Sequence, residues 1–196
     1  MVRKILFAIA LFATFQSIAQ QKEDTGRSGL LKVNLSFNQG FMIYHKANNV
    51  YLGGNLEYFT SKNLSFRGDC FWYIDTRQQK PVLKQNAIVL FGALLHLPKG
   101  KSDFYAGLQP GFSITRPAVS LVSDQSYSIR LLPSLGLSLG YSLYFSKFCH
   151  FFIGVNYLLS RYRGAETGSI KLDEFMISGG LGFHIKTKKQ KRLSQK

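Results

Sequence analysis

The residues of this sequence best suited to chemistry are its four histidines, His45, His96, His150 and His184. If the last two long segments of alternating polarity pair as neighbouring strands, His150 lies opposite His184, and both side chains point to the same inner face. Two imidazole rings so placed could begin a metal site. The sequence brings no carboxylate or thiolate to ligand spacing beside them, so we predict a neutral histidine pair and no bound metal.

The sequence contains no common motif for catalysis or cofactor binding. It has no glycine-rich phosphate loop, no His-Glu-x-x-His and no Cys-x-x-Cys. No serine, histidine and acidic residue stand out as a nucleophilic set. We therefore predict that the chain is not an enzyme, with no catalytic residues and no cofactor. Cys70 and Cys149 fall on segments that a closed eight-stranded sheet places on opposite sides, which predicts no disulfide.

Three charged residues share one face of two neighbouring segments and form a second candidate site. In the expected pairing, Glu57 lies opposite Arg67, and Asp69 lies one inward position further along. Buried charges persist in proteins when they are paired and hydrogen-bonded. We predict an ion-pair network of Glu57, Arg67 and Asp69 inside the protein. The alternative function for these residues is a path for protons or ions.

The segments that must position these residues alternate strictly between apolar and polar side chains. From Leu64 to Asp75 the even positions are mostly apolar and the odd positions carry the charges. A period of two is typical of a β-strand with one apolar and one polar face. Eight such segments follow one another, at Leu30–Tyr44, Asn49–Phe59, Asn63–Asp75, Asn86–Leu97, Asp103–Thr115, Ser128–Tyr144, Phe148–Tyr162 and Asp173–Lys186.

The connections between these segments are mostly long on one side and all short on the other. Outer-membrane barrels have short periplasmic turns and longer outside loops. The longest internal apolar run, Ala87 to Leu97, is too short for the roughly 20 residues of a membrane-spanning helix. The sequence therefore predicts an all-β fold, an eight-stranded antiparallel up-and-down transmembrane β-barrel.

Register offers a test of this fold. A three-residue turn after the second strand sets Glu57 opposite Arg67, Asn55 opposite Asp69, Tyr58 opposite Phe66 and Leu52 opposite Trp72. Two features fit less well. The fourth strand is apolar on both faces, so its inward face is not determined. Pro110 and Pro133 lie within the fifth and sixth strands, and we expect them to face each other at a local bulge.

The ends of the chain predict export. Arg3 and Lys4 precede an apolar stretch, and Ser17-Ile18-Ala19 suits a signal peptidase. A membrane anchor is the alternative, but the apolar stretch is too short for one. The expected organisation is a signal peptide at 1–19, a periplasmic lead-in at 20–28, the outer-membrane barrel at 29–186 and a basic periplasmic tail at 187–196.

A net charge of +15 indicates anionic partners. Nucleic acid is disfavoured for an exported chain, whereas lipid head groups and phosphorylated lipopolysaccharide bind Lys and Arg electrostatically. Basic residues of the expected extracellular loops would make these contacts, namely Arg77, Lys80, Lys84, Arg116, Arg161, Arg163 and Lys171.

The most specific short motif lies in the last strand. Ser178, Gly180, Phe183 and Ile185 resemble the terminal signal that the barrel assembly machinery recognises in its clients. The signal consists of a polar residue, a glycine two positions on, and then aromatic and apolar residues at alternate positions. In proteins that carry this signal, the chain usually ends at the final hydrophobic residue, whereas here Lys186 to Lys196 follow it.

From about Leu30 to Lys186 the chain resembles the small eight-stranded outer-membrane barrels, the OmpA transmembrane domain and OmpX-like proteins. The resemblance implies a monomeric, non-enzymatic envelope protein with a structural or adhesion-type role, in contact with outer-membrane lipid, lipopolysaccharide and the barrel assembly machinery. A secretion accessory, a lipid-A-modifying barrel enzyme and a soluble lipocalin-like ligand-binding barrel are the alternatives.

Overall fold

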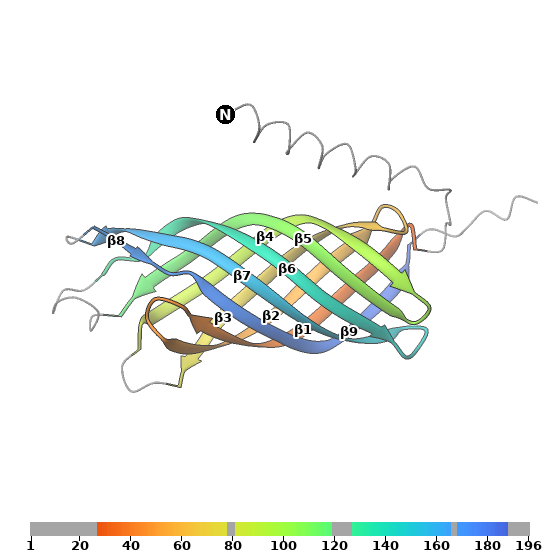
Figure 1. The fold of residues 1–196 in the computed structure, drawn as a ribbon, viewed down its shortest axis with the longest axis horizontal. Coiled ribbons are helices and arrows are strands. Elements are labelled where there is room, and N and C mark those ends of the chain that lie inside the picture. The colour runs from red at the N-terminus through yellow and green to blue at the C-terminus, as the bar shows by residue number, and fades with distance from the viewer. Residues whose placement is uncertain (1–26, 78–80, 119–126, 166–167, 188–196) are drawn as a thin grey trace, which may run out of the picture.

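The chain forms a closed antiparallel β-barrel. The computed structural model describes residues 27–77, 81–118, 127–165 and 168–187. Eight long strands form a ring in which each pairs with its neighbours and the last, β9, pairs with β1 (Figure 1). The strands are β1 (Leu30–Met42), β2 (Ala47–Phe59), β3 (Leu64–Thr76), β4 (Leu83–Lys99), β5 (Ser102–Pro117), β6 (Arg130–Tyr144), β7 (Cys149–Ala165), β8 (Gly168–Lys171) and β9 (Glu174–Lys186).

The predicted direction of the side chains is confirmed. Leu137 and Leu139 lie on the outside of the barrel, 48% and 61% exposed, whereas Arg67 and Asp69 are 5% and 4% exposed inside it. The four predicted pairs between β2 and β3 are also observed. A tight turn leaves little freedom for the strands to slide, and its length therefore determines which residues meet.

The structure determines the inward face of β4. Ile88, Leu90, Leu94 and His96 are buried in the lumen, whereas Phe91 and Leu97 lie outside. The lumen beside the first two is itself apolar, because they pack with Phe71, Leu158 and Met176 from other strands. Both faces of β4 therefore meet apolar surroundings over much of its length, and hydrophobic alternation cannot distinguish them.

The prediction for the two prolines was wrong. Pro110 pairs with Leu135, and Pro133 pairs with Phe112, so the prolines are offset from each other. The β5–β6 ladder continues through both without a register shift, while the β4–β5 pairs are interrupted between Leu90–Gly111 and Ala93–Leu108. Proline has no amide hydrogen to donate, and here the gap falls on the β4 side of Pro110.

The strand β8 lies within the segment that we expected to be the last loop. It pairs with the outer part of β7, which extends three residues beyond its predicted end at Tyr162 (Figure 1). Its four residues are too few for alternation to indicate a strand. The pairing depends on β7 continuing past the rest of the barrel wall at the loop end.

The predicted leader at 1–19, most of the lead-in at 20–28 and residues 188–196 of the tail lie outside the described residues. Within the described ranges, no helix is long and apolar enough to cross a membrane.

Candidate functional site

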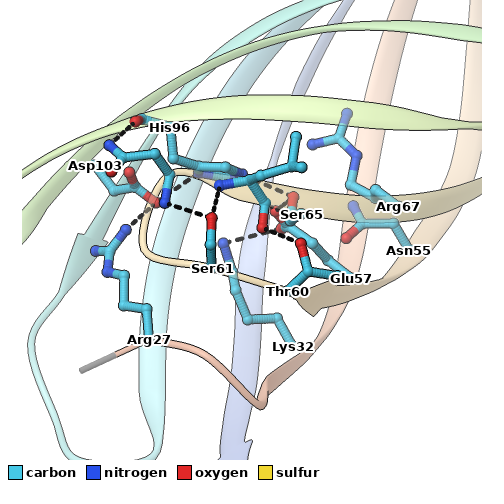
Figure 2. Close-up of polar contacts among 12 residues, drawn as sticks. Arg27, Lys32, Asn55, Glu57, Thr60, Ser61, Ser65, Arg67, His96 and Asp103 are labelled. Atoms are coloured by element: carbon cyan, nitrogen blue, oxygen red, sulfur yellow. Dashed lines mark hydrogen bonds and ion pairs between the residues drawn. The ribbon is translucent and has the colours of Figure 1, made fainter. Parts of the chain in front are cut away.

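A cluster of charged and polar side chains, most of them buried, lies at the end of the barrel where the short turns are. We call it the basal cluster, and it comprises Arg27, Lys32, Glu57, Ser65, His96 and Asp103 (Figure 2). Lys32 on β1 lies directly opposite Glu57 on β2, and its Nζ is 3.1 Å from Glu57 Oε2. Both side chains are 1% exposed. The pair therefore neutralises two charges that water cannot reach.

His96 links the Glu57 carboxylate to a second carboxylate. Its Nε2 lies 2.8 Å from Glu57 Oε1, and its Nδ1 lies 2.9 Å from Asp103 Oδ2. Arg27, just before β1, lies at the short-turn end of the cluster, and its guanidinium is 2.9 Å from Asp103 Oδ2. Arg27 also lies over the rings of Phe59 and Tyr144. The start of the described chain is thus tied to the lumen by both charge and aromatic contact.

The basal cluster contains a serine–histidine–aspartate arrangement that the sequence did not indicate. Ser65 Oγ lies 2.8 Å from His96 Nε2, and Asp103 contacts the other ring nitrogen. The three residues come from β3, β4 and β5, so the structure brings together a set that did not stand out in the sequence. The missing information was the inward face of β4, which determines where His96 points.

Glu57 prevents this arrangement from working as a hydrolytic triad. The Ser65 hydroxyl donates to Glu57 Oε1 at 2.6 Å, and the same oxygen accepts from His96. Both ring nitrogens of His96 lie within 3 Å of a carboxylate oxygen, and an imidazolium held between Glu57 and Asp103 has no lone pair to take the serine proton. Ser65 and Asp103 are fully buried, which leaves no approach for a substrate.

The predicted network of Glu57, Arg67 and Asp69 is divided between two clusters. Arg67 Nε donates to Asp69 Oδ2 at 2.8 Å, and Gln109 bonds to both of these side chains. Glu57 faces Arg67 across the β2–β3 ladder, but its carboxylate bonds to the basal cluster. Sequence reasoning missed Lys32 because it compared only the second and third strands.

Apolar side chains interrupt the polar lumen above the Arg67–Asp69 pair. Phe71, Ile88, Leu90, Leu158 and Met176 form a buried layer with Tyr51. Beyond it, Glu174 accepts hydrogen bonds from Tyr51 and Asn49, and a second apolar cluster lies at the loop end. An ion crossing these layers would lose its hydration without a polar replacement, which argues against the predicted alternative of an ion path.

The prediction that His150 faces His184 was wrong by two residues. His150 pairs with Gly182, and its ring reaches His184 diagonally, with the two Nδ1 atoms 3.3 Å apart. A side chain at Gly182 would overlap the His150 ring, so the glycine makes room for it. The described residues contain no group of three or more His, Cys, Asp or Glu side chains arranged to hold a metal.

The outer wall of the barrel is a continuous apolar surface. Large apolar side chains of every long strand are exposed on it, for example Leu35, Leu56, Trp72, Phe91, Phe104, Leu139, Ile153 and Phe183. A water-soluble protein rarely exposes apolar patches of this extent. A charged, filled lumen inside an apolar wall is the arrangement that a lipid environment requires.

No protein-family model matches the sequence, and no curated protein matches it. The structure is similar to the N-terminal β-barrel domain of Pseudomonas aeruginosa OprF, with TM-score 0.57 and 14% identity over 81% of this chain and 98% of that one. Similarity to outer membrane protein OprG of Pseudomonas aeruginosa (TM-score 0.58, 12%) and to Neisserial surface protein A (0.57, 15%) covers 81% of this chain and 97% of each. The fold is that of the small eight-stranded outer-membrane β-barrels.

On this outer-membrane barrel fold, the β7–β8 ribbon carries a group of exposed cations at the loop end. Arg161 lies directly opposite Lys171, and Arg163 follows on the same face. All three are exposed, and Arg130 reaches them by donating to the Arg163 carbonyl at 2.9 Å. We call Arg130, Arg161, Arg163 and Lys171 the basic band.

The other predicted loop cations are more dispersed. Arg77 and Lys84 are exposed near the β3–β4 connection, and Arg116 is half-buried, its Nε donating to the Tyr127 carbonyl at 3.0 Å. Lys80 lies outside the described residues. The structure therefore brings together Arg161, Arg163 and Lys171, and adds Arg130, which the sequence reasoning did not select.

The four residues of the predicted assembly signal alternate about the wall of β9. Ser178 points inward and accepts a hydrogen bond from Asn156 at 3.2 Å, whereas Phe183 and Ile185 lie on the apolar outer surface. Gly180 lies opposite Ser36 and Phe152 on the neighbouring strands. This placement leaves the role of the motif in assembly a prediction.

Ser65→Ala tests whether the basal triad is structural. We expect the variant to lose about 1 to 3 kcal/mol of unfolding free energy, because Glu57 and His96 lose a buried hydrogen-bonding partner. Hydrolysis of p-nitrophenyl acetate is expected to be equal for both proteins and at background level. Ser169→Ala, which changes an exposed serine on β8, is the control. Ester hydrolysis that depends on Ser65 would contradict the structural role.

Proposed function

We propose that this chain is an integral outer-membrane protein, exported with a leader at residues 1–19, and that its barrel serves as an anchor. The apolar wall and the similarity of fold to three outer-membrane barrels support this location. The soluble lipocalin-like alternative needs a polar exterior and an apolar cavity. The observed arrangement is the reverse, with Arg67 and Asp69 inside and Leu137 outside.

In this proposal, the short turns and both chain ends face the periplasm. The basal cluster then lies at the periplasmic mouth and the basic band at the outer surface. The filled lumen and the blocked triad favour a non-enzymatic role in the envelope, structural or adhesion-type. The barrel assembly machinery would insert the chain, as a monomer, through the motif around Gly180.

The basic band supports lipopolysaccharide as the outer contact. Like charges directly opposite each other on a β-ribbon are destabilising, and Arg161 and Lys171 stand in that relation. Phosphate groups bound between them would remove the repulsion, and Arg binds phosphate with two parallel hydrogen bonds. Because the band continues the outer wall above the apolar surface, its side chains would lie at the level of the lipid A phosphates.

Neutralising three of the four residues of the basic band tests this contact. We expect Arg161→Gln, Arg163→Gln and Lys171→Gln together to weaken retention on immobilised lipopolysaccharide on the order of a hundredfold, since each cation contributes about 1 kcal/mol near an anionic surface. The difference in retention between wild type and this variant should become smaller in high salt, because salt screens exposed charges.

The matched control carries three neutral substitutions at the short-turn end, Lys99→Gln, Lys101→Gln and Lys147→Gln, and should bind as wild type. Dephosphorylated lipopolysaccharide should bind wild type and the band variant equally. Equal retention of the two proteins on phosphorylated lipopolysaccharide would remove the proposed contact.

A further inference from the structure

Two strands of the barrel wall separate near the loop end. The β3–β4 ladder stops at the Trp72–Ala87 pair. β3 continues to Thr76, and β4 already begins at Leu83. In the described chain, the outermost residues of both strands therefore lack pairing across this seam. Unpaired backbone groups are costly in hydrocarbon, which places the seam where water or lipid head groups reach it.

A bulge lies on each side of the seam and accounts for the separation. In the β2–β3 ladder, Tyr51 pairs with Tyr73 and Val50 with Asp75, so Ile74 is the extra residue. In the β4–β5 ladder, the shift between Leu83 and Gln85 makes Lys84 the extra residue. Bulges bend the strand that carries them and redirect its side chains. β3 and β4 each carry one, on the edge away from their shared seam.

A groove of about 320 Å³ occupies this site. Its apolar lining comes from the outer wall, namely Trp72, Ile74, Ala87, Ile114 and Ile129, and Tyr73 and Asn86 form its inner side. This volume lies at the lower end of the range for small-molecule sites, about 300 to 1,000 Å³. It suits one segment of an acyl chain rather than a whole lipid.

A cation stands at the edge of the groove. Lys84 belongs to its lining and is exposed, because the bulge turns it outward together with Gln85. If the β3–β4 ladder continued beyond Trp72, Asp75 would lie opposite Lys84, but the strands have already diverged there. An apolar floor with an ammonium group at one end matches an amphiphile with an anionic head.

We infer that this groove binds one acyl chain of a phosphorylated lipid of the outer leaflet, with the lipid phosphate beside Lys84. The inference rests on the proposed outer-membrane location. The site is distinct from the basic band, because it lies on the β3–β4 seam and holds a chain as well as a phosphate.

Photolabelling in lipid vesicles tests the site. The protein is reconstituted in phosphatidylcholine with a single-chain phosphate amphiphile that carries a diazirine in its acyl chain, or with the same chain on an uncharged glycerol head. Labelled positions are mapped by peptide mass spectrometry. We expect the phosphate probe to label residues 72–87 roughly fivefold more than the uncharged probe, and more than the wall of β6 and β7.

Two variants separate the chain from the phosphate. Ile114→Trp fills the groove and should reduce labelling of 72–87 at least fivefold, whereas Leu137→Trp, on the wall of β6, should leave it unchanged. Lys84→Gln should bring both probes to equal labelling, and Lys99→Gln should not. Ile129→Trp, which precedes β6, replaces Ile114→Trp if heat-modifiable gel migration shows that the latter has not folded.

Several results would overturn the site. These are labelling spread evenly around the wall, equal labelling by both probes in wild type, or no effect of a folded groove-filling variant. Cross-linked dimers through 72–87 would assign the groove to a second copy of the chain and overturn it as well. Failure of the basic-band experiment alone would remove the lipopolysaccharide contact and leave the groove standing, so the two proposals fail separately.

Discussion

Replacing Glu57 with glutamine is expected to destabilise the barrel by about 3 to 5 kcal/mol, the loss measured when one partner of a buried ion pair is removed. The carboxylate contacts Lys32 at 3.1 Å, His96 at 2.8 Å and Ser65 at 2.6 Å. A neutral amide leaves the Lys32 ammonium without its counter-charge in a site with 1% exposure. Urea unfolding in lipid vesicles, followed through the single tryptophan Trp72, measures the change.

A double variant distinguishes the effect of losing the ion pair from the effect of losing side-chain packing. Lys32→Met with Glu57→Gln removes both charges and should recover much of the loss, since burying a neutral pair carries no charge-desolvation cost. Arg77→Gln, an exposed change at the other end of the barrel, should alter stability by less than about 0.5 kcal/mol. A Glu57→Gln protein as stable as wild type would show that the basal cluster contributes nothing to closure.

Gly180→Ala is expected to prevent normal closure of the barrel between β9 and β1. A Cβ atom on Gly180 would overlap the backbone carbonyl of Leu35, which cannot rotate away as a side chain can. Overpacking typically costs 1 to 3 kcal/mol, and we expect about 3 kcal/mol or more here because the obstruction is backbone on the paired strand. Heat-modifiable gel migration after refolding reports the closed fraction.

Gly179→Ala is the matched control, because a Cβ atom at Gly179 has nothing within 4 Å. It should refold as wild type does. Refolding in vitro proceeds without the assembly machinery, so a Gly180→Ala defect seen only in cells would assign Gly180 to the assembly signal. A variant that closes normally in both settings would show that neither the close approach to Leu35 nor the signal depends on this glycine.

The basal cluster and the barrel wall suggest how charge is distributed in this protein. Arg27 and Lys32 balance the charges of Asp103 and Glu57 inside the barrel, so these residues add little to the field at the surface. On the β7–β8 ribbon, Arg161 lies opposite Lys171, and Arg163 follows on the same exposed face. In the proposed orientation, the excess positive charge of the outer end is therefore concentrated at the interface with lipid head groups.

The sequence alone determined the number of barrel strands, the closed antiparallel fold and the inward or outward direction of most side chains. A period of two leaves only two choices for which face of each strand points into the barrel. Only one choice places apolar residues such as Leu137 on the outer wall and charged residues such as Arg67 in the lumen. It also determined the β2–β3 register, because a short turn allows few ways for Glu57 to meet Arg67. These features depend on residues close in sequence.

The tertiary structure decided the features that depend on distant residues. The inward face of β4 follows from the apolar lumen that other strands create around Leu90. The offset of Pro110 from Pro133, and of His150 from His184, follows from closure of the whole ring, which the local pattern around each strand does not specify. The contact of Ser65 with His96 depends on how β3 pairs with β4, and that of Lys32 with Glu57 depends on how β1 pairs with β2. The basal cluster therefore forms only when these strands are brought together.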